Sequence, residues 1–176
     1  IKAVRYGDTV FLDYPNLEVK RAMAQLYIER LLDGKVAGQV GAGPIVKVLA
    51  EESAESVFHI LNRLFTAIDY HNYPVKDEAS LRAYVQVYFS GAELEAKVEQ
   101  HNAHGRSDLE VSAGERHWVF EFKVSYDGEK EEEILLEGIS QMKARHYGEQ
   151  KDSKELRRIV LVYSIPSRQF VKWKTC

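Results

Sequence analysis

The sequence predicts an α/β fold in which a mainly helical N-terminal part precedes a mixed β-sheet. Apolar residues recur at helical spacing through most of the first half, and from about Glu93 the apolar period changes to two. A further amphipathic helix and a nearly continuous apolar strand follow, so the second half has the order helix, three strands, helix, strand. We therefore expect a helical subdomain over residues 1–75 and a sheet-containing core over residues 76–176.

Four helices are expected before the sheet. Asn16 is the expected N-cap of the first. Its predicted apolar stripe consists of Val19, Met23, Leu26, Tyr27 and Leu31. A short helix is expected after Pro44, and Ser53 precedes a well-patterned amphipathic helix. Asp77 is the expected N-cap of the fourth helix, which places Glu78 in a first turn where a carboxylate suits the helix dipole.

Five segments make up the core that is expected beyond the fourth helix. Residues 93–99 alternate between apolar and charged side chains, which is typical of a strand with one wet face. Residues 108–112 and 117–124 are two further strands joined by a short turn. Residues 131–147 carry a helical apolar stripe, and the apolar run 159–165 is expected at the centre of the sheet.

Length and composition limit the class of protein. A chain of 176 residues is long enough for one domain with its own core, so disulfides and metal ions are not needed for stability. Cys176 is the only cysteine, which excludes a disulfide framework and predicts a reducing, cytoplasmic location. No apolar run approaches the roughly 18 residues of a membrane helix. The first residue is Ile1 rather than Met, which indicates part of a longer polypeptide or a processed product.

The net charge limits how this protein could bind nucleic acid. The formal net charge of −3 argues against a protein that coats nucleic acid by bulk electrostatic attraction, because that mode needs a basic excess. Local basic patches remain compatible with this net charge. The sequence gives no information on oligomeric state.

The expected hairpin brings two carboxylates together. A turn centred between Gly114 and Glu115 places Asp108 directly opposite Glu121, with Cβ atoms roughly 4.5 to 5.5 Å apart. Lys123 follows Glu121 by two residues, so it projects from the same face of the strand. Two acids and a lysine on one patch can bind a hard divalent cation, activate a water molecule and stabilise a phosphorane-like transition state.

Other interpretations of these residues remain open. Taken alone, the pair of Glu121 and Lys123 is more typical of a solvated ion pair on a wet sheet face. His101 and His104 lie near Asp108 and could assist a metal, although this spacing in a loop is more typical of a polar turn. Ser107 has no base partner in sequence, and neither G-x-S-x-G nor a Walker-type phosphate loop is present, which excludes acyl hydrolases and nucleotide switches.

Several segments resemble a known family. They are Gly105-Arg106-Ser107-Asp108-Leu109, Val119-Phe120-Glu121-Phe122-Lys123, and Gln141 followed by Tyr147. With the predicted element order, they resemble the PD-(D/E)XK nuclease superfamily, and most closely the branch that usually follows a predicted AAA-ATPase-like domain in bacterial proteins. The segment Tyr14-Pro15-Asn16-Leu17-Glu18-Val19 is similar to that branch's entry to the region, so the resemblance extends over nearly the whole chain.

The resemblance implies a restriction-endonuclease-like core with an N-terminal helical subdomain, and it implies roles for the three residues of the hairpin. Asp108 matches the first metal ligand and Glu121 the second, with Mg²⁺ as the implied cofactor and Mn²⁺ as its substitute. Lys123 matches the catalytic lysine that assists the attacking water.

The resemblance adds three site residues outside the hairpin. Glu78 matches the family's acidic position on the helix before the sheet. Gln141 and Tyr147 match a motif on the second core helix that helps to position nucleic acid or the reacting water. Two features depart from the pattern: the ATPase-like region is absent from this chain, and the acidic residues 127–133 lengthen the link between Lys123 and that helix.

The resulting expectation is a magnesium-dependent nuclease that hydrolyses DNA phosphodiester bonds, with RNA as a second candidate substrate. Its implied partner is the ATPase-like domain of a longer polypeptide, and no membrane is involved. The alternative is a catalytically silent, nuclease-like module that binds nucleic acid or protein.

Overall fold

The computed structural model describes residues 2–6, 9–34, 42–102, 105–144 and 154–176. In the N-terminal half the elements are β1 (Lys2–Tyr6), β2 (Thr9–Asp13), α1 (Leu17–Leu31), α2 (Ala42–Glu51), α3 (Ala54–Ala67) and α4 (Glu78–Gly91). The second half contains β3 (Ala96–Asn102), β4 (Gly105–Ala113), β5 (Arg116–Ser125), α5 (Glu131–Ala144), β6 (Glu155–Ser164) and β7 (Gln169–Thr175). Among these residues, no helix combines the length and apolar character needed to cross a bilayer.

The chain is a mixed α/β protein built on one five-stranded sheet, which is consistent with the PD-(D/E)XK fold expected from the sequence. The strand order is β3-β4-β5-β6-β7. The β5–β6 pair is parallel, and α5 connects these two strands, whereas the other three pairs are antiparallel. The helix, three-strand, helix, strand order predicted for residues 76–176 appears as α4, β3–β5, α5 and β6, with β7 as an added edge strand.

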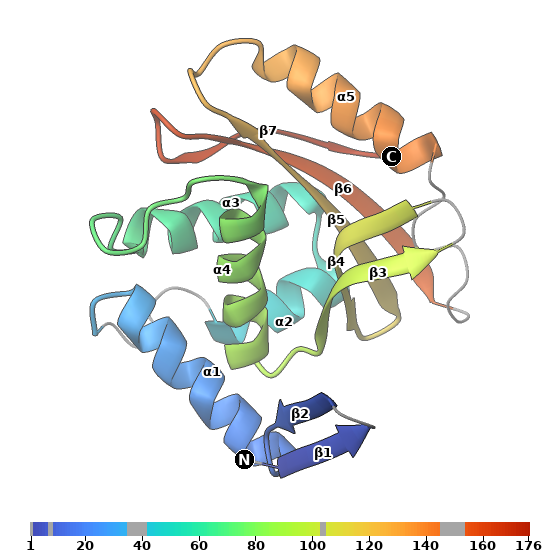
Figure 1. The fold of residues 1–176 in the computed structure, drawn as a ribbon. Helices are drawn as coiled ribbons and strands as arrows, with labels where there is room; N and C mark the ends of the chain where they lie inside the picture. Colours follow the sequence, from blue (N-terminus) through green and yellow to red (C-terminus); the bar gives the residue numbers. More distant parts are fainter. Residues whose placement is uncertain (1, 7–8, 35–41, 103–104, 145–153) are drawn as a thin grey trace.

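Helices cover both faces of the sheet (Figure 1). On one face a large apolar cluster joins the sheet to the helices α1 to α4. On the other face a smaller cluster lies under α5 and contains Leu135 and Met142 of α5 with Val119, Val160 and Val162 of the sheet. Because the large cluster includes residues on both sides of position 75, the N-terminal helices and the sheet share one core, and the division into subdomains stays a prediction.

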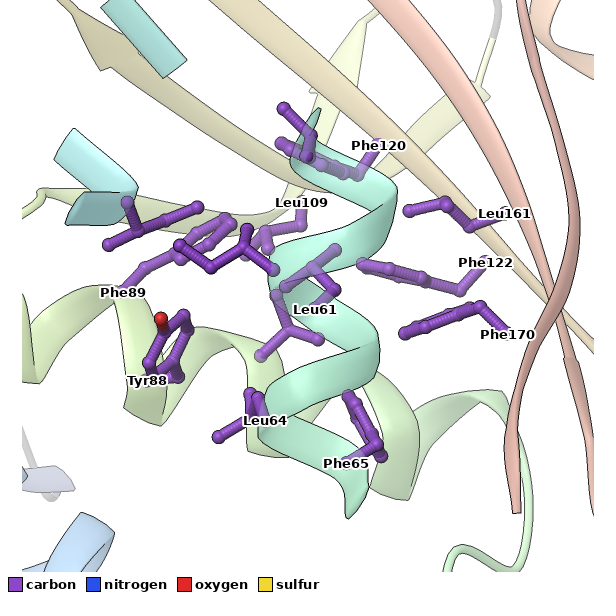
Figure 2. Close-up of a cluster of buried hydrophobic side chains, with 14 of the residues drawn as sticks. Leu61, Leu64, Phe65, Tyr88, Phe89, Leu109, Phe120, Phe122, Leu161 and Phe170 are labelled. Carbon is purple, nitrogen blue, oxygen red and sulfur yellow. The ribbon is translucent and has the colours of Figure 1, made fainter. Parts of the chain in front are cut away.

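The helix α3 lies at the centre of the large cluster. Figure 2 shows Leu61, Leu64 and Phe65 of α3 among side chains from α4 and from the strands of the sheet. The labelled residues around them are Tyr88, Phe89, Leu109, Phe120, Phe122, Leu161 and Phe170. The aromatic rings of Phe120 and Phe122 are stacked, with centroids 5.9 Å apart. This packing holds one face of the strand β5 in place, and polar residues lie on the opposite face of the same strand.

The N-caps predicted for two helices, Asn16 for α1 and Asp77 for α4, are confirmed. Asn16 accepts a hydrogen bond from the backbone N–H of Val19, and Ser53 accepts one from Ser56. The apolar stripe predicted for α1 is wrong in part, because α1 buries Ala24, Ile28 and Leu31. Three members of the predicted stripe are exposed: Val19, Leu26 and Tyr27. Contact with α4 determines which face of α1 is buried, and helical spacing alone does not reveal that face.

Strand boundaries differ in part from the prediction. The first strand begins at Ala96 rather than Glu93, because Glu93 has a positive φ of 64° and belongs to the turn after α4. The second strand is longer than predicted, because it begins at Gly105 rather than at Asp108. Neither the β1–β2 hairpin nor β7 was predicted. The helix predicted to reach Tyr147 is described as far as Ala144.

Candidate active site

The polar face of β5 carries two of the predicted site residues. Alternation along the strand sends Phe120 and Phe122 into the large apolar cluster, so Glu121 and Lys123 project from the opposite face, toward α5. The Lys123 Nζ lies 3.3 Å from Glu121 Oε1. Their side chains are only 16% and 2% exposed, so the pair is not the solvated surface pair that was the alternative interpretation.

Asp108 lies where the β4–β5 ladder stops. The register pairs Ala113 with Arg116 and Leu109 with Phe120, as predicted from the position of the turn. Asp108 is the next residue beyond the last pair of this ladder. Here the side chain makes the contact between the strands: Asp108 Oδ2 accepts a hydrogen bond of 2.9 Å from the backbone N–H of Phe122. This bond fixes the carboxylate beside Glu121 on the neighbouring strand.

The N-terminus of α4 reaches the same end of the hairpin. Asp77 caps the helix in a capping box with Ser80, and these hydrogen bonds hold the pKa of the Asp77 carboxyl below its usual value. Glu78, the first residue of the helix, accepts a hydrogen bond of 3.3 Å at Oε1 from the backbone N–H of Val124. Its carboxylate therefore ties α4 to β5 at the site, rather than lying in bulk solvent.

Arg82 is a site residue that the sequence interpretation missed. It follows Glu78 by four residues, so the two side chains lie on the same face of α4. Its Nη1 lies 3.3 Å from Asp108 Oδ1, and the two side chains are 15% and 18% exposed. The helical spacing from Glu78 was the signal that could have identified it.

Gln141 contributes from α5. Its Oε1 accepts a hydrogen bond of 2.8 Å from Lys123 Nζ. The helix can approach the lysine because Gly138 lies one turn earlier, where an added Cβ would meet Val160 Cγ1 at 2.6 Å and Lys123 Cγ at 3.3 Å. Lys123 is thus held from two sides, by Glu121 on its own strand and by Gln141 on the helix above it.

These side chains line one pocket of about 370 Å³. Its lining includes five of the six predicted site residues together with Arg82: Glu78, Arg82, Asp108, Glu121, Lys123 and Gln141. The sixth, Tyr147, lies outside the described residues, as does His104. The pocket also includes Asp77, so four carboxylates and two cationic side chains line it, a formal balance of −2.

The donor chemistry of this pocket fits a hard divalent cation. Asp108 and Glu121 supply carboxylate oxygens, the ligand type that Mg²⁺ and Mn²⁺ prefer, and none of the described residues that line the pocket carries a thiolate or an imidazole. Within the described ranges, no group of three or more Asp, Glu, His or Cys side chains is arranged to hold a metal ion. Two carboxylates are nevertheless sufficient for Mg²⁺, which is commonly held by one or two carboxylates with water and substrate phosphate completing its shell.

Fold and site together define a class of protein: a mixed α/β protein with two carboxylates and a lysine gathered in one pocket at the end of a β-hairpin. Residues 76–173 match the PD-(D/E)XK nuclease superfamily, and this match covers more than half of the chain. The chain belongs to the PD-(D/E)XK nuclease superfamily. Membership suggests nuclease activity on a nucleic acid, and members typically use divalent metal ions.

One curated relative extends the comparison. It is a protein of Azotobacter chroococcum mcd 1 described as "Uncharacterized protein in vnfD 5'region", and it is 26% identical over 117 residues. The aligned part is 64% of this chain and 23% of the relative, so the chain spans less than a quarter of that protein's length.

Proposed function

We propose that this chain is a metal-dependent nuclease that hydrolyses DNA phosphodiester bonds, with Mg²⁺ as the natural cofactor and Mn²⁺ as a substitute. The observation that carries the proposal is the meeting of Asp108, Glu121 and Lys123 in one pocket. The formal balance of −2 in that pocket would repel a phosphate, and a divalent cation removes the repulsion.

Each side chain then has a defined role. Asp108 and Glu121 would hold the cation from neighbouring strands, and a magnesium ion bound there supplies Lewis-acid stabilisation of phosphate charge. Lys123 Nζ donates a hydrogen bond to the phosphate oxygen on which negative charge increases. Gln141 orients this lysine through the 2.8 Å hydrogen bond, and Glu78 positions the end of α4. Tyr147 keeps the nucleic-acid-positioning role that the family resemblance implies.

We also propose which polypeptide, partner domain and cellular location this chain belongs to. The chain spans less than a quarter of its curated relative, which supports a place for this domain within a longer polypeptide. We infer an AAA-ATPase-like domain as the partner, and a bacterial cytoplasm as the location, from the family branch that the sequence resembles. RNA is the second candidate substrate.

The test is a cleavage assay on single-stranded and double-stranded DNA, and on RNA of the same sequence, with Mg²⁺, with Mn²⁺ and with a chelator. We expect metal-dependent cleavage by the unmodified chain and none by Asp108→Ala. Equal turnover by both proteins would reveal a contaminating nuclease. No turnover on any substrate would contradict the proposal for this chain alone.

One observation favours the alternative of a silent binding module. Asp108 and Glu121 each already have a cationic neighbour in the protein, Arg82 and Lys123. If these ion pairs persist, the carboxylates serve the stability of the fold and bind no metal. A metal titration separates the two functions, because the module would show only weak binding that Asp108→Ala leaves unchanged.

A further inference from the structure

We propose that Arg82 is an exchangeable cap on Asp108. It holds the Asp108 Oδ1 in the metal-free protein, yields that oxygen to the cation, and then turns its guanidinium to the substrate phosphate. This inference rests on the proposed function, because it concerns the order in which that site is filled.

The two oxygens of Asp108 are held in different ways. Oδ2 is bound by the backbone N–H of Phe122, a group that is fixed by the strand β5. Oδ1 is bound by the side chain of Arg82, which is long and has several rotatable bonds. A cation that approaches Asp108 from the pocket therefore meets a carboxylate whose orientation is set by the backbone of Phe122. The other oxygen of this carboxylate, Oδ1, is held by the movable side chain of Arg82.

Arg82 and a divalent cation compete for the same charge. The two side chains of the ion pair are 15% and 18% exposed, so the pair is much less screened than the surface pair of Arg21 and Glu93, at 39% and 61%. A divalent ion beside Asp108 would repel the adjacent guanidinium. Metal binding at Asp108 and the contact between Arg82 and Asp108 are therefore negatively coupled, so removing one strengthens the other.

Release of Arg82 would not carry it out of the site. Glu78 binds the backbone of Val124 one helical turn earlier, so the end of α4 remains attached to β5. Only the side chain of Arg82 needs to rotate, and its guanidinium stays within the pocket that it lines. A planar guanidinium matches two phosphate oxygens at once, which suits it to a phosphate brought in by the cation.

The test is a calorimetric titration of the metal-free chain with Mn²⁺ in the absence of nucleic acid. We expect Arg82→Met to bind Mn²⁺ about tenfold more tightly than the unmodified chain, a typical size for coupling between two binding events. Arg82→Lys, which keeps the charge, should fall between them. Arg21→Met removes the arginine of a surface ion pair and should leave the affinity unchanged.

A second readout follows the folded state. Arg82→Met leaves the partly buried Asp108 carboxylate without its ion pair, so the metal-free variant should melt at a lower temperature than the unmodified chain. Added Mn²⁺ should raise its melting temperature by more than it raises that of the unmodified chain, because the variant binds the ion more tightly.

The outcomes separate this inference from the proposed function. If the unmodified chain binds Mn²⁺ and Arg82→Met binds it equally or more weakly, Arg82 only braces Asp108, and the cap is overturned while the metal-dependent function stands. Should neither protein bind Mn²⁺, both proposals fail. Tighter binding by Arg82→Met that disappears in the double variant with Asp108→Asn supports the cap.

Discussion

The two faces of β5 differ in what they contact, although their residues alternate along one strand. Phe120 and Phe122 enter a closed apolar cluster that four helices help to build, whereas Glu121 and Lys123 lie beneath a single helix at the edge of a pocket. Glu121 is as well buried as Phe122. The difference lies in the partners, because the acid is matched by a cation and the ring by other rings.

This comparison shows how one strand can serve two purposes. The period of two sends the side chains to opposite faces without any unusual backbone geometry in β5. Substitutions on the apolar face should therefore change stability, and substitutions on the polar face should chiefly change chemistry. Substitutions at four positions test or sharpen this separation.

The largest effect is expected on the apolar face. Phe120 is completely buried, and Phe120→Ala should lower the free energy of unfolding by about 3 to 5 kcal/mol. Chemical denaturation followed by circular dichroism measures this loss. Residual folded protein should still bind Mn²⁺ with unchanged affinity, and a large loss of affinity would show that the two faces are not separable.

The next effect is expected on the polar face. Lys123→Ala should slow cleavage by about 100-fold, the typical loss when one charge-stabilising donor is removed. Metal affinity should not fall, because the carboxylates of Asp108 and Glu121 remain and Glu121 loses its competing cation. Lys123→Gln serves as the second variant, since it keeps a donor near the buried Glu121 while removing the positive charge. Rates measured at saturating Mg²⁺ check the prediction, and unchanged rates would assign Lys123 to stability alone.

A smaller effect is expected where α5 contacts the polar face. Gly138→Ala would bring a Cβ to 2.6 Å from Val160 Cγ1, so α5 must shift away from the sheet. We expect a loss of about 1 to 3 kcal/mol in stability from this overpacking, together with slower cleavage because Gln141 moves with the helix. Ser140→Ala, at an exposed position of the same helix, is the matched control for both thermal melting and cleavage.

The smallest effect is expected at the helix that supplies Glu78 and Arg82. Asp77→Ala removes the N-cap of α4 and should lower stability by about 1 kcal/mol, whereas Asp77→Asn should keep most of the cap. Hydrogen bonds from Ser80 lower the folded-state pKa of Asp77 below its value in the unfolded chain, so its contribution is present above the unfolded-state pKa and is lost as the pH falls through the folded-state pKa. Melting curves of the unmodified chain and of Asp77→Ala at pH 7 and at progressively lower pH test this, and the difference between the two proteins should shrink as the pH falls.

The period of two and the position of one turn were sufficient to predict the central part of the site. They placed Asp108 beside Glu121 and put Lys123 on the same face, because strand geometry leaves little freedom once the register is fixed. The functional roles of these residues, and of Glu78 and Gln141, came from the family resemblance and stay predictions.

Other parts of the fold could not be predicted from local pattern. The strand β7 contains a register shift opposite Val162 and Tyr163, so Phe170 and Trp173 join the same cluster although their numbers differ in parity. Arg82 escaped notice because its role depends on contact with Asp108, 26 residues away in sequence. In both cases the decisive contact is tertiary: helical spacing places Arg82 on the same face of α4 as Glu78, but it does not reveal the contact with Asp108.

The most direct test of the central claim is a crystal structure of the chain grown with Mn²⁺, in which anomalous scattering locates the ion. We predict a peak within coordination distance of both Asp108 and Glu121, with Arg82 withdrawn from Asp108 Oδ1 and Lys123 still bound to Gln141. No peak in this pocket, with the Arg82–Asp108 ion pair intact at saturating Mn²⁺, would contradict the assignment of the polar face of β5 as a metal-dependent active site.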